Sequence, residues 1–225
     1  MATAAPIPNR HQIIFRSLEG FLVRAIGEKE YSGIKTVLEF GCGKTGFAGD
    51  YLRPGRVSYG VDLHDHTDHW RKLGVLYRMS DGITIPLADS SIDLVVAHSV
   101  VEHVENLPNS LREINRVLKP GGIGYITVSP LYFSPNGSHI RSLPDWEHLR
   151  PGSKYYMMQQ PIDREGAYLN KLTMSELLGM IGALPWNIMR MERFTVDNEI
   201  PDWLTGFPVL DLITREFRLV VRKAG

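Results

Sequence analysis

The chain has 225 residues, with 25 basic and 25 acidic side chains and therefore no formal net charge. No lysine- or arginine-rich run is present, which argues against a surface that binds nucleic acid through its phosphates. The single cysteine excludes a disulfide within the chain. No apolar stretch is long enough to span a bilayer and the N-terminus lacks the features of a signal peptide, so we expect a cytoplasmic protein that does not enter the membrane. We also expect a monomer or a homodimer.

Helical and extended patterns alternate along the chain. Apolar residues recur at helical spacing from His11 to Ile26, so we predict an N-terminal helix within residues 1–30 that packs over the cofactor or substrate cleft. A helical segment at 111–118 ends in a Pro-Gly-Gly turn, and a capping box at Thr173 opens a helix that runs to Leu184. Short β-rich runs occupy residues 36–40, 57–63, 75–79, 92–97, 124–128, 186–194 and 216–223.

Strands that alternate with helical or loop segments are typical of βαβ units. We therefore predict that residues 1–225 form a single α/β domain. Its Rossmann-like, seven-stranded, mostly parallel sheet is flanked by helices, and its last strand is antiparallel.

Residues 130–170 interrupt this alternation with a long stretch rich in Pro, Gly, Ser, Tyr and His. A loop of this length in a compact domain is usually functional, so we predict a lid over the substrate. Its aromatic residues suit either an apolar wall of the substrate site or a small satellite core: Tyr132, Phe133, Trp146, Tyr155 and Tyr156.

A glycine-rich turn follows the first predicted strand, in Glu39-Phe40-Gly41-Cys42-Gly43-Lys44-Thr45-Gly46. Glycines between a strand and a helix let the backbone approach a ligand closely. Gly43-Lys44-Thr45 imitates the end of a phosphate-binding P-loop, but Leu38 stands where that motif needs glycine. The spacing of Gly41, Gly43 and Gly46 matches a dinucleotide fingerprint, so an NAD(P)-dependent oxidoreductase stays open.

Five segments, in order, resemble the motifs of class I S-adenosylmethionine-dependent methyltransferases, in particular the type 11 group. They are Val37–Gly43, Gly60–Leu63, Ser80–Gly82 with Ile85–Leu87, Ser91–Val96 with Val101–Val104, and Leu118–Gly122. The resemblance implies S-adenosylmethionine as cofactor. At its methionine part it implies contacts with the amino group from Glu39 and nearby packing by His98, with Gly41 and Gly43 beneath methionine and ribose. It further implies that Asp62 binds the ribose hydroxyls, that Leu63 packs on the adenine face, and that Asp81, in its turn with Gly82, binds the adenine amino group.

The charge of Glu39 separates the two cofactor hypotheses. A carboxylate beside the glycine turn suits a cationic amine and a sulfonium, whereas it would repel a pyrophosphate. The simpler interpretation of Glu39 is a cap on the helix that we expect to follow Gly43.

A histidine-rich turn at His64, His66, Asp68 and His69 has the pattern H-x-H-x-D-H, which resembles the metal-binding signature of metallo-β-lactamase-like hydrolases. That hypothesis, a metal-dependent hydrolase, leaves the other ordered motifs unexplained, so we assign no metal site.

The resemblance implies methyl transfer to an acceptor, which we predict to be a small molecule or a glycan methylated at oxygen. An oxygen acceptor benefits from a general base, and the candidates are His103, His139 and His148. The stretch 137–149 faintly resembles methyltransferases of bacterial glycan biosynthesis. A non-catalytic module that keeps the donor pocket remains an alternative.

Overall fold

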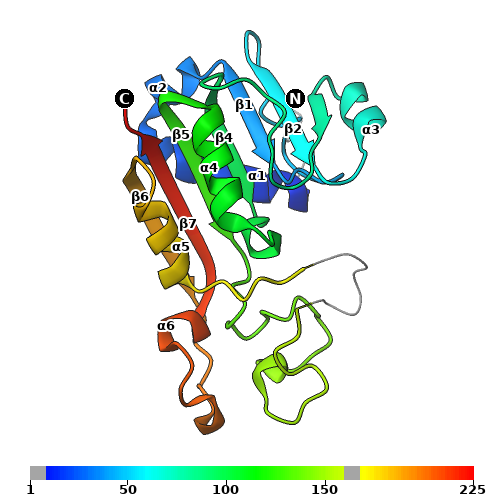
Figure 1. Cartoon of the computed structure of the whole chain (residues 1–225), viewed down its shortest axis with the longest axis vertical. Coiled ribbons are helices and arrows are strands. Elements are labelled where there is room, and N and C mark those ends of the chain that lie inside the picture. The colour runs from blue at the N-terminus through cyan, green and yellow to red at the C-terminus, as the bar shows by residue number, and fades with distance from the viewer. Residues whose placement is uncertain (1–8, 160–167) are drawn as a thin grey trace, which may run out of the picture.

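In the computed structural model, which describes residues 9–159 and 168–225, seven strands form one sheet in the order β3-β2-β1-β4-β5-β7-β6 (Figure 1). Strands β1 to β5 pair in parallel, and β7 runs antiparallel to both β5 and β6. The predicted mostly parallel sheet with an antiparallel last strand is therefore confirmed. The strands are β1 (Thr36–Phe40), β2 (Val57–Asp62), β3 (Leu76–Met79), β4 (Ile92–His98), β5 (Leu118–Val128), β6 (Trp186–Thr195) and β7 (Thr214–Lys223).

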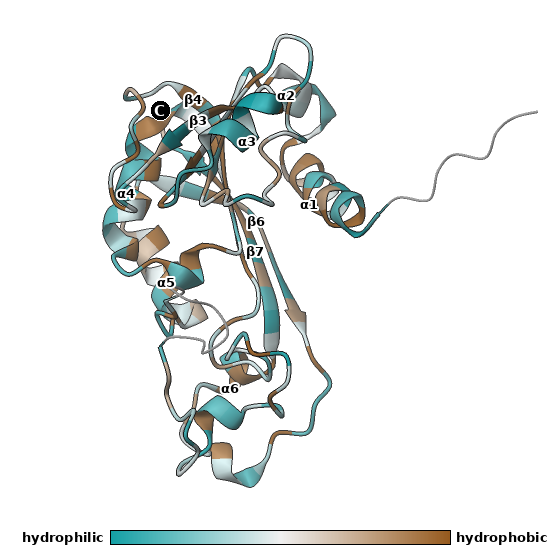
Figure 2. Cartoon of the chain, turned by 90° about the vertical axis from the view of Figure 1, so that its right-hand side faces the viewer, coloured by the Kyte–Doolittle hydropathy of each residue, from teal (hydrophilic) through white to brown (hydrophobic). Residues whose placement is uncertain are grey.

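Helices cover both faces of this sheet. Figure 2 shows α1 (Arg10–Ile26) on one side and α4 (Leu107–Val117) and α5 (Met174–Gly182) on the other. Helix α1 buries Phe15, Leu18, Phe21 and Leu22, and each buried side chain of this size stabilises the fold by about 1.5–3 kcal/mol. The remaining helical pieces are α2 (Glu28–Gly33), α3 (Thr67–Lys72), α6 (Val209–Leu212), and the 3-10 turns η1 (Val101–His103), η2 (Glu147–Leu149) and η3 (Asp202–Leu204).

Local capping explains where two helices begin. The Thr173 side chain accepts from the Glu176 amide and the Glu176 carboxylate accepts from the Thr173 amide, which confirms the predicted capping box. Asn9 and Gln12 form the same arrangement at the start of α1.

Two expectations about local structure were wrong. Strand β5 begins at Leu118 and continues through the Pro-Gly-Gly sequence, because a bulge opposite Ile92 and the positive φ of Gly121 (76°) absorb the irregularity. Residues 41–51 form turns instead of a helix, and the Phe47 amide donates to the Glu39 carboxylate.

The segment 130–159 packs mostly on itself and on the chain around η3 and α6, beyond one end of the sheet (Figure 1). Tyr132, Phe133 and Trp146 form a satellite core with Leu149, Leu169, Leu204 and Leu212. Three of the five aromatic residues of the predicted lid therefore follow the satellite-core alternative, whereas Tyr155 and Tyr156 lie outside that core; residues 160–167 of the lid lie outside the described residues.

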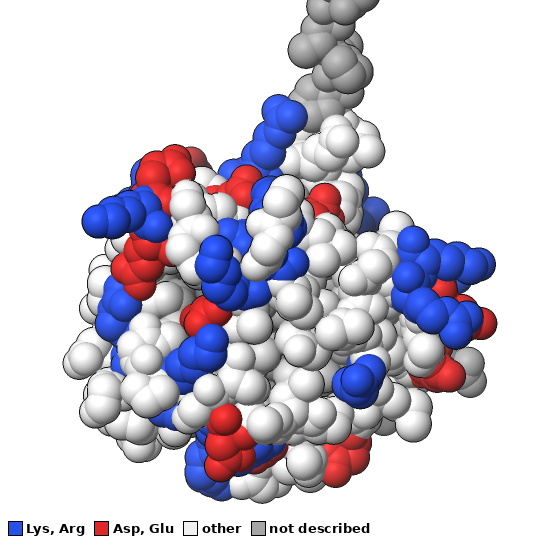
Figure 3. All heavy atoms as spheres, turned by 90° about the horizontal axis from the view of Figure 1, so that it is seen from above, with Lys and Arg blue, Asp and Glu red and all other residues white. Residues whose placement is uncertain are grey.

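Basic and acidic side chains are intermingled on the face shown in Figure 3, in keeping with the zero net charge of the sequence. Among residues 9–159 and 168–225, every helix is too short or too polar to cross a membrane.

Candidate functional site

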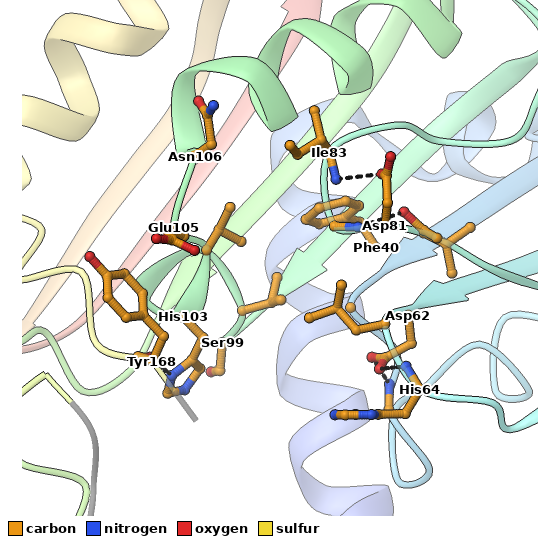
Figure 4. A pocket seen from close by; sticks show the side chains of 18 of the residues that line it. Phe40, Asp62, His64, Asp81, Ile83, Ser99, His103, Glu105, Asn106 and Tyr168 are labelled. Atoms are coloured by element: carbon orange, nitrogen blue, oxygen red, sulfur yellow. Dashed lines mark hydrogen bonds between the residues drawn. The ribbon is translucent and has the colours of Figure 1, made fainter. Parts of the chain in front are cut away.

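A cavity of about 940 Å³ lies at the carboxyl ends of β1, β2 and β4 (Figure 4). Ligands of open α/β sheets bind at this edge, and the volume is within the range of small-molecule sites. We call it the first cavity. Its walls are formed by Phe40, Gly41, Gly43, Val61, Asp62, Leu63, His64, His66, Ser80, Asp81, Gly82, Ile83, Ser99, Val100, His103, Val104, Glu105, Asn106 and Tyr168.

The glycine turn forms the floor at the end of β1. Gly41 has φ 72°, and a Cβ there would lie 2.1 Å from Cγ2 of Val100, so the backbone and the neighbouring side chain both require glycine. Gly43 has φ 49°, and a Cβ there would meet nothing within 4 Å. The absence of a side chain at Gly43 therefore keeps space open beside the cavity.

Asp62, at the end of β2, ties this turn in place. Its Oδ2 accepts from the Gly43 amide at 2.7 Å and its Oδ1 accepts from the His64 amide at 3.2 Å. A carboxylate has about four acceptor sites, so both oxygens keep capacity for a ligand hydroxyl. In Figure 4 Asp62 and His64 lie opposite His103 and Tyr168.

Apolar and acidic side chains share the β2–β3 side of the first cavity. Leu63 is 57% exposed and Ile83 is 41% exposed, so both present apolar surface to the space. Asp81 accepts from the amides of Ile83 and Thr84, which hold the pKa of its carboxyl below the usual range. A Cβ on Gly82 would lie 2.7 Å from Cδ2 of Leu63, so glycine there makes room for the leucine.

Two predicted cofactor residues, Glu39 and His98, stand behind the cavity wall instead of on it. Burial raises the pKa of Glu39 to about 8, although the amides of Phe47 and Ala48 act in the opposite direction. His98 pairs through Nδ1 with the Thr127 hydroxyl at 2.6 Å, and burial lowers its pKa to about 4. In this position Glu39 caps the turn that carries the glycines.

A second cavity of about 510 Å³ adjoins the first, and the two share Ser99 and His103. It is polar and contains two arginines from remote parts of the chain. Its walls are formed by Arg10, Ser99, His103, Ser129, Pro130, Asn136, His139, Ile140 and Arg141.

His103 and His139 come together although 36 positions separate them in the sequence. Their ring centroids lie 4.8 Å apart at an interplanar angle of 75°. The adjacent Glu102 is 2% exposed, and burial raises its pKa to about 8. Ligand atoms of these three residues lie within 4.8 Å of one another.

His148, the third candidate base, is fully buried and lines neither cavity. Its Nε2 donates to the Tyr132 carbonyl at 2.6 Å, and burial lowers its pKa to about 4. This environment is typical of a structural histidine in a satellite core.

The histidine-rich turn is split by the fold. His64 and His66 line the first cavity with ring centroids 6.4 Å apart, whereas His69 packs edge-on against Trp70. Among the described residues, this turn does not gather three ligand atoms at metal-binding distance.

Sequence reasoning missed several wall residues. Ser99 directly follows β4, so the rule that ligands sit beyond strand ends was enough to find it. Arg10, Arg141 and Tyr168 carry no such signal, because only the tertiary structure brings them to the cavities.

Comparison with known proteins finds similarity to methyltransferases. The model of a methyltransferase domain matches residues 38–126. A protein of Mycobacterium sp. strain KMS, described as an uncharacterized methyltransferase, is 31% identical over 114 residues, which cover 49% of this chain and 45% of that protein. The ubiquinone biosynthesis O-methyltransferase of Ruegeria pomeroyi is 26% identical over 196 residues, covering 74% of this chain and 76% of that enzyme.

The fold is also shared with solved structures. An S-adenosylmethionine-dependent methyltransferase from Mesorhizobium loti superposes with a TM-score of 0.60 at 18% identity, covering 92% of this chain and 100% of that one. The chain spans about half the length of the first curated relatives it matches.

Proposed function

We propose that the chain, whose residues 38–126 match the model of a methyltransferase domain, is a class I S-adenosylmethionine-dependent enzyme of the type 11 group that transfers a methyl group from S-adenosylmethionine to an oxygen of a small molecule or glycan. One observation carries the proposal. The first cavity, at the ends of the parallel strands, opens beside a second, polar cavity, and the two meet at Ser99 and His103. A donor and an acceptor held side by side are what group transfer requires.

The first cavity fits the donor. Asp62 offers carboxylate oxygens for the ribose hydroxyls, and Leu63 and Ile83 offer apolar surface for the adenine ring. The open space at Gly43 lets a ligand lie against the backbone. The turn after β1 does not continue into a helix, so the helix N-terminus on which a dinucleotide pyrophosphate sits is not formed by residues 41–51.

Glu39 and His98 influence the donor site although neither lines the first cavity. We assign to Glu39 two functions: it holds the turn through the Phe47 amide, and its charge attracts the cationic amino group of the donor, directly or through water. An ammonium group near Glu39 favours its ionised form, against the effect of burial. His98 contributes a neutral imidazole at the same side of the sheet.

S-adenosylmethionine, when bound, supplies a methyl group on a sulfonium, and transfer of that group leaves a neutral thioether. The chain positions the acceptor oxygen and disposes of its proton. His103 lines both cavities and His139 lines the second, which supports these two histidines, and not His148, as the residues that contact the acceptor hydroxyl. Arg10 and Arg141 give the second cavity positive charge, which suits an acceptor that carries a carboxylate or phosphate.

The decisive experiment has two arms. Calorimetry with S-adenosylmethionine and with NAD should give binding to the first and none to the second; the opposite result would falsify the methyltransferase proposal. Incubation with a panel of hydroxylated acids, phenols and sugar phosphates should then give a product heavier by one methylene in mass spectrometry. Tight donor binding without any product across the panel would favour a non-catalytic binding module.

A further inference from the structure

We propose that Glu102, His103 and His139 bind one divalent transition-metal ion at the junction of the two cavities. The site itself stands on the geometry below, and only its role in methyl transfer rests on the proposed function. Ligand atoms of the three side chains lie within 4.8 Å of one another, so small side-chain movements bring them to the bonds of about 2.0–2.2 Å that one ion makes.

Glu102 supplies an observation that points to a ligand. Its side chain is 2% exposed, and its Oε1 accepts from the Ser129 amide at 3.2 Å. Its Oε2 is buried and has no hydrogen-bond partner in the part of the chain that the structure describes. A buried carboxylate oxygen without a donor costs free energy, and a cation at this position would remove that cost.

Both histidines already make the outer contacts that orient a metal ligand. Nδ1 of His103 donates to the Tyr168 carbonyl at 2.8 Å, and Nε2 of His139 donates to the Pro130 carbonyl at 3.3 Å. A carbonyl only accepts, so in each contact the named ring nitrogen carries the proton. Metal-binding histidines in proteins are held by this kind of contact.

The fold also fixes the position of the first two ligands. Glu102 and His103 lie in η1, immediately beyond β4. Asn170 braces that turn, since its Nδ2 donates to the carbonyls of Val101 and Val104 at 2.6 and 3.0 Å and its own amide donates to the Glu102 carbonyl at 3.0 Å. His139 comes from the segment after β5 and also lines the second cavity.

Two imidazoles and one carboxylate select the class of ion. Mg²⁺ and Ca²⁺ prefer all-oxygen sites, whereas Zn²⁺, Co²⁺, Mn²⁺ and Fe²⁺ accept this set. Three protein ligands leave a coordination position for an exchangeable molecule, as in catalytic zinc sites. Because His103 lines both cavities, that position is within reach of an acceptor oxygen. With the ion bound, the two histidines would act on the acceptor through the ion and not by direct contact: the ion would lower the pKa of the acceptor hydroxyl, and its proton would pass to solvent.

The test measures metal binding without any acceptor. The 225-residue protein is stripped with a chelator, dialysed and titrated with Co²⁺ while its visible absorption is recorded, and Zn²⁺ is titrated by calorimetry. We expect one ion per chain and a visible Co²⁺ band. His139→Ala and Glu102→Gln should each lose the band and weaken Zn²⁺ binding at least about tenfold, since outer contacts alone are worth about that much.

The matched control is the double variant His64→Ala/His66→Ala, which removes the two neighbouring histidines of the exposed turn. It should keep the Co²⁺ band and the Zn²⁺ affinity. Loss of the band in this control but not in His139→Ala, or no band in the wild type, would overturn the proposal. Thermal unfolding of each variant identifies a folding defect, and should Glu102→Gln fail to fold, His139→Ala carries the result.

Different results would refute the metal site and the methyltransferase function. His139 does not line the first cavity, so His139→Ala should bind S-adenosylmethionine like the wild type. Normal donor binding without a metal would refute the site alone, and metal binding without donor affinity would refute the proposed function alone.

Discussion

The carboxyl of Glu39 makes the stability of the fold depend on pH in a way that one substitution isolates. Burial raises its pKa from 4.5 to about 8 in the native state, so between these values the native chain carries a proton that the unfolded chain has lost. The contribution of Glu39 to the free energy of unfolding is therefore complete below the unfolded-state pKa and is lost as the pH rises through the native-state pKa. Each pH unit in this interval lowers the free energy of unfolding by at most about 1.4 kcal/mol.

Between about pH 6 and pH 8 this group alone should lower the free energy of unfolding by about 2 kcal/mol, because the native carboxyl begins to ionise near the upper limit. Glu39→Gln keeps an oxygen for the Phe47 amide and removes the titration. Urea unfolding across this range should show a flatter dependence on pH in Glu39→Gln than in the wild type, with the difference growing to about 2 kcal/mol.

Glu113→Gln is the matched control. The Arg116 guanidinium holds the pKa of Glu113 below its usual value, so this carboxyl stays ionised throughout the same range and the variant should follow the slope of the wild type with a constant offset. Parallel curves for the wild type and Glu39→Gln would refute the argument, since they would mean that Glu39 is ionised in the native state despite its burial.

Three further expectations concern the cavities. Asp62→Asn should weaken S-adenosylmethionine binding at least about tenfold, or about 1.4 kcal/mol, because a charged acceptor is lost, and an unchanged affinity in calorimetry would exclude Asp62 from the donor site. Gly41→Ala should destabilise the protein in urea by about 2–3 kcal/mol and Gly43→Ala by about 1, since only the first alanine collides with Val100; equal losses would contradict the geometry. His148→Ala should lower stability by about 2–4 kcal/mol yet keep the turnover of the folded enzyme, and a selective loss of turnover in an acceptor assay would restore His148 to the catalytic candidates.

The parts of the fold that follow from local pattern were predictable. All seven strands carry a β-rich run, and the capping box at Thr173 marks the start of α5 to the residue. The Pro-Gly-Gly turn failed as a prediction because β5 tolerates a bulge there, which depends on its pairing with β4. The expected helix after Gly43 failed because residues 41–51 close separate turns, with the Gly46 amide on the Cys42 carbonyl and the Tyr51 amide on the Phe47 carbonyl, and no periodicity in the sequence reports this.

The residues of the candidate site also divide into those that a local sequence pattern predicts and those that only tertiary packing brings together. Gly41, Gly43, Asp62 and Asp81 lie next to strand ends, so the strand pattern was enough to bring them to one edge of the sheet. Leu63, Gly82 and His103 follow by the same reasoning. The approach of His139 to His103 depends on how the segment after β5 packs, and no periodicity in the sequence reports it.

The two cavities are built from different segments of the chain, so substitutions should affect them differently. The first cavity is made by strand ends and the turns beside them, together with Tyr168, whereas the second draws on α1, the end of β4 and the segment 129–141. No described residue of 130–141 lines the first cavity. Substitutions in that segment should therefore alter which acceptor is methylated and leave donor affinity intact, and Arg141→Ala should raise KM for an anionic acceptor without changing the Kd of S-adenosylmethionine. A parallel loss of both affinities would mean that the two cavities form one coupled site, in which the segment orders the donor as well as the acceptor.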